Sequence, residues 1–215
     1  IQSENGGLND YFNTGICHRK HCHRTPHQVV LMSVEIAMKT VGFNVRGDRQ
    51  KDDYYATPPE ATDALLSVES FKGNIFEPCC GEGHISKRLI ERGYEVESSD
   101  LVDRGYGIPK RDFLFEREKR DNIITNPPFK LALLMAEHAQ SVARYKTALL
   151  LKITFLEGVA RTEFFQRHPP ARVWVFSRRL SLLKDGQSYK KGGMMCLAWF
   201  VWETGSTKPP QIGWI

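Results

Sequence analysis

Glu77-Pro78-Cys79-Cys80-Gly81-Glu82-Gly83 is the stretch that decides the fold. It follows Asn74-Ile75-Phe76, a short apolar run typical of a buried strand, and it precedes residues 84–92, whose apolar residues recur at helical spacing. Gly93 then ends the helix. Strand, glycine turn and helix form the opening unit of a Rossmann-like sheet. The dinucleotide fingerprint GxGxxG is not met, because Ser86 stands where its third glycine would lie.

The second informative stretch is Asn126-Pro127-Pro128-Phe129, which follows the apolar run at 122–125. Asn126 should therefore lie at the carboxyl end of a buried strand, where open α/β sheets bind ligands. The prolines lack N–H groups and have a fixed φ, so the turn is stiff and directs its carbonyls outward. The side-chain carbonyl of Asn126 and the backbone carbonyl of Pro127 can each accept one hydrogen bond from a planar NH2 group. Phe129 offers a face on which a flat base could stack, although an ordinary strand-to-helix loop would also use Asn and Pro.

Two acidic residues lie between these stretches. Asp100 ends the predicted strand at 94–100, where its carboxylate could accept hydrogen bonds from both hydroxyls of a ribose. Asp112 precedes Phe113 and is placed to accept from an adenine amino group. Alternatively, Asp100 caps the following turn and Asp112 is a surface acid. The ordered series of glycine turn, strand-end acid, acid-aromatic pair and Asn-Pro-Pro-Phe favours the functional interpretation.

The series resembles the S-adenosylmethionine-dependent amino methyltransferases, and it is most similar to DNA adenine-N6 methyltransferases of phages and prophages. Further segments of similarity are 53–59, 155–158 with Arg161, 198–203 and 212–215. The resemblance implies a Rossmann-like methyltransferase fold, with a mostly parallel seven-stranded sheet and helices on both faces. It also implies a catalytic domain at 53–215, preceded by an extension at 1–52. In that extension, residues 25–42 have the apolar spacing of one helix that would pack on the core.

The resemblance also implies the site residues. S-adenosylmethionine would be the methyl donor, wrapped by the glycine turn, with Asp100 on its ribose, Asp112 on its adenine and Thr57 near its methionine part. The catalytic residues Asn126, Pro127, Pro128 and Phe129 would hold the amine of a flipped-out adenine. The cofactor-binding residues would be Tyr55, Thr57, Pro58, Glu77, Pro78, Cys79, Gly81, Gly83, Asp100, Leu101, Asp112 and Phe113. Cys79 departs from the family, in which a small residue often precedes the cysteine.

Other acceptors present the same NH2 geometry. RNA adenine methyltransferases and glutamine N5-methyltransferases use a similar Asn-Pro-Pro-aromatic motif, and a non-catalytic nucleic-acid-binding relative is a further alternative. The chain has 215 residues and a formal net charge of +5, and residues 157–192 alone carry eight Lys or Arg and three Asp or Glu. Because a glutamine enzyme needs no basic face, this charge favours nucleic acid, foremost double-stranded DNA.

The residues expected to contact phosphates are Arg161, Arg178, Arg179, Lys184, Lys190 and Lys191, and Arg167 and Arg172 extend the same basic segment. A solvated loop face is the alternative explanation of this charge. Neither the target sequence nor the oligomeric state can be derived from the sequence.

The rest of the composition is typical of a cytoplasmic protein of a bacterium or a phage-infected host cell. No apolar run reaches the roughly 18 residues of a transmembrane helix, and the first residues lack a signal-peptide pattern. The five cysteines are odd in number and two are adjacent in the glycine turn, which favours free thiols. Residues 17–23 contain five possible zinc ligands, but no matching second pair follows, so we assign no metal. A tag remnant, a disordered arm or a basic nucleic-acid contact would also explain them.

Overall fold

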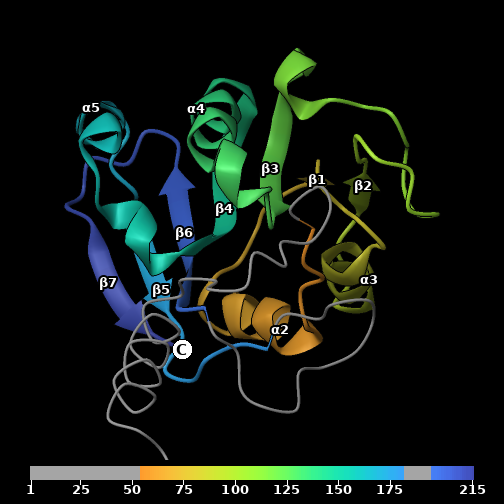
Figure 1. The fold of residues 1–215 in the computed structure, drawn as a ribbon, viewed down its shortest axis with the longest axis horizontal. Coiled ribbons are helices and arrows are strands. Elements are labelled where there is room, and N and C mark those ends of the chain that lie inside the picture. Colours follow the sequence, from red (N-terminus) through yellow and green to blue (C-terminus); the bar gives the residue numbers. More distant parts are fainter. Residues whose placement is uncertain (1–53, 182–194) are drawn as a thin grey trace, which may run out of the picture.

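The computed structural model describes residues 54–181 and 195–215, which form a single seven-stranded sheet between helices (Figure 1). The strand order is β2-β1-β3-β4-β6-β5-β7. β6 runs antiparallel to both of its neighbours, and all other pairs are parallel. The strands are β1 (Ile75–Glu77), β2 (Val96–Ser98), β3 (Arg120–Thr125), β4 (Ala143–Lys152), β5 (Arg172–Val175), β6 (Leu197–Glu203) and β7 (Gln211–Trp214).

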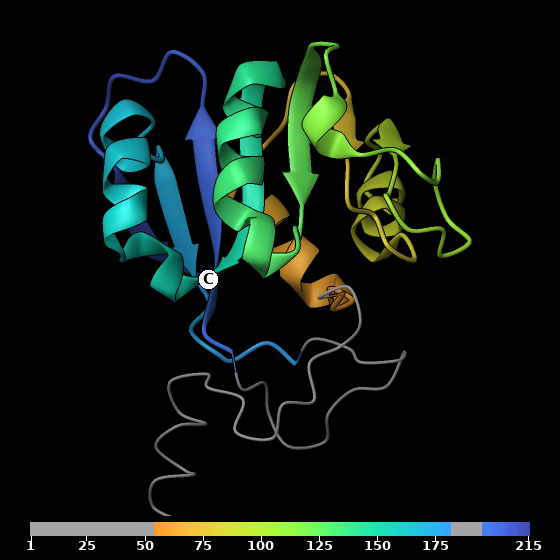
Figure 2. The same cartoon turned by 45° about the horizontal axis from the view of Figure 1, so that its top comes forward.

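Helices cover both faces of the sheet, as Figures 1 and 2 show. One face carries α2 (Pro59–Val68) and α3 (His84–Glu91), and the other carries α4 (Ala132–Val142) and α5 (Val159–Arg167). Short 3₁₀ helices occur at Phe113–Phe115 (η2), Phe129–Leu131 (η3) and Ile153–Leu156 (η4). The fold class predicted from the sequence is therefore confirmed.

The core follows from the alternation of side chains along β3 and β4. Ile124 and Leu150 face α2 and α3, whereas Ile123 and Leu149 point to the opposite face and pack under α4. This is the pattern of strands buried on both faces, which read as continuous apolar runs. Trp199 of β6 is fully buried, and its indole Nε1 donates a hydrogen bond of 2.8 Å to the backbone carbonyl of Ala61 in α2.

Most elements lie where the sequence predicts them. The sequence pattern also predicts helices near 130–143 and 160–167, and a hairpin of strands near 173–176 and 197–202. These elements, the strands before the two motif turns and α3 are confirmed. The apolar run at 147–151 predicts a further strand, which corresponds to β4. β4 begins four residues earlier, at Ala143. α2 and β7 were not predicted as elements. The helix expected at 25–42 and the Cys and His residues at 17–23 lie outside the described residues.

The connection from β2 to β3 contains no α-helix. Residues 99–119 form an isolated parallel bridge between Ser99 and Ile108 and the short helix η2. Within 54–181 and 195–215, no helix is both long and apolar enough to span a membrane.

Candidate functional site

The carboxyl ends of β1, β2 and β3 lie along one edge of the sheet, because these strands are parallel. The glycine turn follows β1, Asp100 follows β2, and Asn126 follows β3. The two motifs that the sequence singled out are thus brought to the same edge. This edge is the usual ligand-binding position of open α/β sheets.

The glycine turn is built on left-handed backbone. Gly81 has a φ of 55° and Gly83 a φ of 79°, a region that favours glycine. A Cβ atom on Gly81 would lie 2.2 Å from the Tyr54 ring, and one on Gly83 would lie 2.4 Å from the Tyr106 ring. Both positions therefore require glycine for conformation and for space.

Glu77 lies inside the protein beneath this turn. Its side chain is 1 % exposed and accepts hydrogen bonds from the backbone N–H of Ser86, at 2.8 Å, and from the Ser86 hydroxyl. The Ser86 hydroxyl also lies 2.6 Å from the hydroxyl of Ser98 in β2. Burial raises the pKa of Glu77 to about 8, although the hydrogen bonds from Ser86 oppose the shift. Glu77 thus joins β1 to the start of α3 from within.

Asp100 connects the end of β2 to the glycine turn. Its Oδ2 accepts a hydrogen bond of 2.8 Å from the backbone N–H of Gly81, and its Oδ1 accepts one of 2.8 Å from Val102. Each carboxylate oxygen has a second lone pair, so Asp100 can still accept a hydroxyl donor. The next side chain, Leu101, is 58 % exposed.

Asp112 and Phe113 have different surroundings. Asp112 is half-buried, and its carboxylate accepts a hydrogen bond of 2.9 Å from the backbone N–H of Leu114, which caps η2. Phe113 is buried in the core, with ring centroids 6.2 Å from Phe76 and 4.9 Å from His138. Of this pair, Asp112 is therefore the side chain within reach of a ligand.

Asn126 is held by the segment that precedes α2. Its Nδ2 donates hydrogen bonds of 3.0 Å to the backbone carbonyl of Tyr55 and 3.0 Å to the hydroxyl of Thr57. A backbone carbonyl can only accept, so the NH2 end of the amide must face Tyr55 and the carbonyl end points the other way. Pro127 and Pro128 contribute no N–H donors beside this carbonyl.

Phe129 is half-buried between two other side chains. The Tyr55 ring lies nearly parallel to it at a centroid distance of 6.1 Å, and the Lys152 ammonium lies 4.9 Å from its centroid. Lys152 ends β4 and so reaches the same edge of the sheet. Lys152 was not predicted as a site residue, because a lysine at the end of a strand has no distinctive pattern.

The segment Tyr54–Thr57 contacts both motifs. The Tyr54 hydroxyl accepts a hydrogen bond of 3.2 Å from the backbone N–H of Glu82 in the glycine turn, and the Arg104 guanidinium lies 4.2 Å from the Tyr54 ring centroid. The same segment holds Asn126 through Tyr55 and Thr57. Pro58, also a predicted site residue, is buried at the N-cap of α2.

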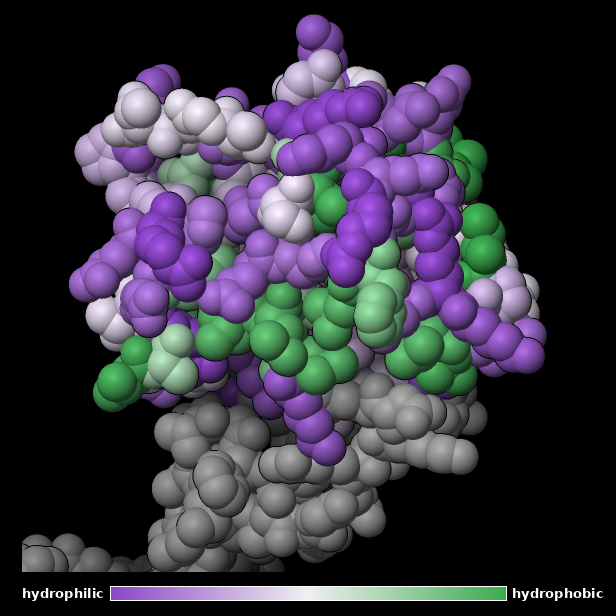
Figure 3. All heavy atoms as spheres, turned by 90° about the horizontal axis from the view of Figure 1, so that it is seen from above, coloured by the Kyte–Doolittle hydropathy of each residue, from purple (hydrophilic) through white to green (hydrophobic). Residues whose placement is uncertain are grey.

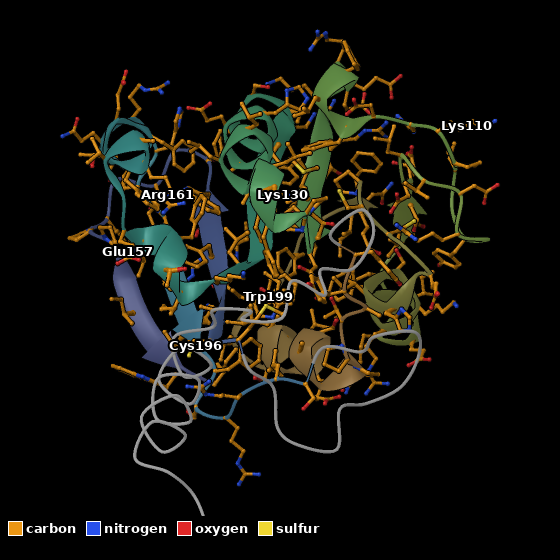
Figure 4. The ribbon with its side chains drawn as sticks, in the orientation of Figure 1. Lys110, Lys130, Glu157, Arg161, Cys196 and Trp199 are labelled. Carbon is orange, nitrogen blue, oxygen red and sulfur yellow. The ribbon has the colours of Figure 1, made fainter. Side chains whose placement is uncertain are left out.

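Within the basic segment that the sequence predicts to contact phosphates, Arg161 and Arg172 are engaged within the protein. The Arg161 guanidinium donates to the backbone carbonyls of Glu157, at 2.6 Å, and Thr154, at 3.3 Å (Figure 4). Arg172 is ion-paired with the buried Glu69 at the amino end of β5, away from the motif turns, so its assignment to the basic surface was wrong.

Arg178 and Arg179 are exposed and follow β5 at the carboxyl edge. Lys184, Lys190 and Lys191 lie outside the described residues. The surface over α4 and α5 is mixed, with apolar groups toward its lower edge in Figure 3. The exposed apolar side chains at the start of α4 and α5 are Leu131, Leu134, Leu156 and Val159.

Solved structures show where this fold occurs. The chain is similar to a modification subunit assigned to a type I restriction enzyme of Vibrio vulnificus YJ016, with 12 % identity and a TM-score of 0.52, over 86 % of this chain and 49 % of that chain. It therefore spans about half of that subunit. It is also similar to a protein of Pyrococcus horikoshii assigned as an RNA methyltransferase, with 14 % identity and a TM-score of 0.53, over 80 % of this chain and 96 % of that chain.

No protein-family model matches the sequence, and no curated protein matches it significantly. The fold is that of the Rossmann-like methyltransferases.

Proposed function

We propose that this protein transfers a methyl group from S-adenosylmethionine to an exocyclic amine of a nucleobase, and that the acceptor is N6 of adenine in DNA. The observation that carries the proposal is the orientation of Asn126. Its NH2 group is held by Tyr55 and Thr57, which turns its carbonyl toward the side from which an acceptor amine would approach. The methyltransferase fold and the neighbouring glycine turn support a methyl donor at the same edge.

The residues after β1 and β2 fit the nucleoside part of S-adenosylmethionine. The glycine turn brings bare backbone to the edge, as a closely approaching ligand requires. Asp100 keeps lone pairs for ribose hydroxyls after its two backbone hydrogen bonds, and the exposed Leu101 beside it offers an apolar contact for a base. Asp112 would accept from the adenine amine, which requires a lone pair beyond the one that caps η2.

When bound, S-adenosylmethionine supplies an electrophilic methyl group on a sulfonium centre. The carbonyls of Asn126 and Pro127 accept one hydrogen bond each from the two hydrogens of the acceptor amine. The amine nitrogen becomes positively charged as the new carbon–nitrogen bond forms, so these carbonyl dipoles stabilise the transition state more than the neutral ground state. A base in a duplex must leave its stack to reach such a site.

DNA and adenine are favoured over the other acceptors by two observations. Residues 53–215 resemble phage and prophage DNA adenine methyltransferases, which favours adenine as the base and DNA as the polymer. The exposed Arg178 and Arg179 at the motif edge suit a phosphate backbone better than a protein glutamine. The two similar structures do not separate DNA from RNA, since one is assigned to a restriction enzyme and the other to RNA methylation.

The test is methyl transfer from labelled S-adenosylmethionine to duplex DNA, RNA or protein, followed by mass spectrometry of the digested product. We expect N6-methyladenine in DNA. Asn126→Ala should lower turnover on the order of 100-fold, because the lost carbonyl acts in the chemical step. Cofactor affinity measured by calorimetry should stay near that of the parent.

The matched control for Asn126→Ala is Asn74→Ala, which removes an exposed amide before β1, at the opposite end of the strand. If the product were N4-methylcytosine, methylated RNA or methylated glutamine, the acceptor would be the corresponding amine and not N6 of adenine in DNA. Cofactor binding without any transfer would indicate the non-catalytic relative instead.

A further inference from the structure

We infer that Thr57 is a positioning residue for the acceptor amine, and that it acts by holding the Asn126 amide in the orientation that the Tyr55 carbonyl sets. The inference rests on the proposed function and adds a role for the segment ahead of α2. Thr57 does not itself touch the acceptor in this role. It acts through the hydrogen bond that its hydroxyl accepts from Asn126 Nδ2, at 3.0 Å.

The two ends of an amide side chain are nearly the same size but differ in chemistry. If the Asn126 amide turned over, its oxygen would face the backbone carbonyl of Tyr55, which also only accepts. Its NH2 group would then face the acceptor amine, donor against donor. Orientation therefore decides whether Asn126 can bind the acceptor at all. The Tyr55 carbonyl sets this orientation, because it can only accept. The Thr57 hydroxyl could accept from or donate to the amide, so its hydrogen bond holds the amide in the orientation that Tyr55 sets.

Thr57 is suited to this role because its side chain is buried and its conformation is restricted. Its side chain is 3 % exposed, and its branched Cβ restricts χ1. The chain is also fixed on either side of it. Ala56 before it is buried, and Pro58 after it is the N-cap of α2, with its carbonyl accepting a hydrogen bond of 3.0 Å from Ala61.

The Tyr55 carbonyl selects the orientation of the amide, and Thr57 contributes the side chain that holds the amide in it. The Tyr55 carbonyl cannot be removed by substitution, whereas the Thr57 hydroxyl can. A contact between Thr57 and the methionine part of the cofactor, which the family resemblance implies, makes a different prediction. Loss of such a contact would weaken cofactor binding, whereas loss of amide orientation would slow the transfer step.

The experiment compares Thr57→Val, which removes the acceptor and keeps the shape, with Thr57→Ser, which keeps the hydroxyl. With saturating cofactor and DNA, Thr57→Val should lower kcat about 5- to 10-fold, as expected for one neutral hydrogen bond. Thr57→Ser should restore kcat to within about 2-fold of the parent, since its hydroxyl accepts equally well. Cofactor Kd from calorimetry should be unchanged in both.

Thr62→Val is the matched control. Thr62 is fully buried in α2, and its hydroxyl has no hydrogen-bond partner among the described residues. Its replacement removes the same group from the same region, so kcat should not change. A parent-like kcat for Thr57→Val, or no recovery in Thr57→Ser, would overturn the inference. Weaker cofactor binding by Thr57→Val at an unchanged kcat would also overturn the inference, and it would indicate that Thr57 contacts the cofactor.

A second measurement does not depend on activity. Hydrogen exchange of the Asn126 side-chain NH2, followed by NMR, should be faster in Thr57→Val than in the parent, Thr57→Ser or Thr62→Val. Equal exchange rates would refute the orienting role even if no polymer were methylated. If Thr57→Val lost its thermal transition, Thr57→Ala would replace it in both measurements. An inactive parent with the expected exchange rates would instead count against the proposed function.

Discussion

At the scale of single residues, the buried Glu77 makes the stability of the fold depend on pH. A carboxylate without a cation beside it is unfavourable in the interior, and burial raises its pKa to about 8. In the unfolded chain the same group titrates near 4.5. Between these values the folded protein keeps a proton that the unfolded chain releases. Stability should therefore be greatest below about pH 4.5 in this respect and fall as the pH rises to 8.

Glu77→Gln should remove this dependence, because the amide cannot ionise and its carbonyl can still accept from Ser86. We expect the free energy of unfolding of the variant to gain about 3 kcal/mol over the parent between pH 5 and pH 8. Urea unfolding across this range measures the gain. Glu95→Gln, at an exposed glutamate, controls for the loss of a carboxylate. Parallel stability curves for parent and Glu77→Gln would contradict the prediction.

The residues of the site differ in how far the sequence could reveal them. Asp100 and Asn126 were predictable because Asp100 ends one predicted strand and Asn126 follows another, and the carboxyl ends of both strands lie at the edge of the sheet. The contact between Asn126 and Thr57 was not, because it joins positions 69 residues apart. The contact between Lys152 and Phe129 was not predictable either, because it depends on the pairing of β4 with β3. Local patterns report strand ends, whereas contacts between segments depend on the complete sheet.

At the scale of elements, ion pairs cover one side of β1 where the chain between β2 and β3 has no α-helix. Arg111 and Arg120 both contact Glu97, at 2.6 Å, and Glu116, at 2.5 and 2.9 Å. Their guanidinium groups lie 5.2 and 4.6 Å from the Phe76 ring centroid. Paired and stacked guanidinium groups thus shield an aromatic core residue.

Glu116→Gln should destabilise the protein by about 2 kcal/mol, because it leaves two arginines without their least exposed partner. Burial alone would raise the pKa of Glu116, but hydrogen bonds from the Glu118 backbone and Arg120 outweigh it and lower the pKa to about 2. This stability is present above about pH 4.5 and is lost as the pH falls toward 2. Thermal unfolding at pH 7 and pH 3 measures both effects.

Glu118→Gln is the matched control, since Glu118 pairs with the same Arg120 but its side chain is 77 % exposed. It should change stability by less than about 0.5 kcal/mol. Equal losses in the two glutamine variants would show that burial does not decide the strength of this network.

The missed elements also have physical explanations. α2 begins at Pro59, directly after the N-cap Pro58, and buries only Ala61, Thr62 and Leu65, so its apolar stripe is narrow. β7 has four residues with Gly213 among them, and glycine weakens a strand pattern. That glycine is required, because a Cβ there would lie 2.2 Å from the Trp174 ring. Strong apolar runs were predictable, and short elements defined by their neighbours were not.

At the scale of the whole molecule, charge is distributed unevenly about the sheet. Arg172 and Arg161 belong to the same basic segment of the sequence as Arg178 and Arg179, yet the fold separates them. Arg172 forms an ion pair with the buried Glu69 at the amino end of β5. Arg161 donates hydrogen bonds to nearby backbone carbonyls. Sequence counts locate a basic segment, but folding decides which of its charges face a partner.

Replacing Arg178 and Arg179 by Gln should therefore weaken DNA binding under the proposed function. Each lost phosphate contact should lower the slope of log affinity against log salt by about one unit. Cofactor affinity should not change. Lys72→Gln with Arg117→Gln removes the same charge from exposed residues before β1 and β3, at the opposite end of the strands. If both double variants lowered the slope equally, net charge and not position would govern binding, and the carboxyl edge would not be the DNA-binding face.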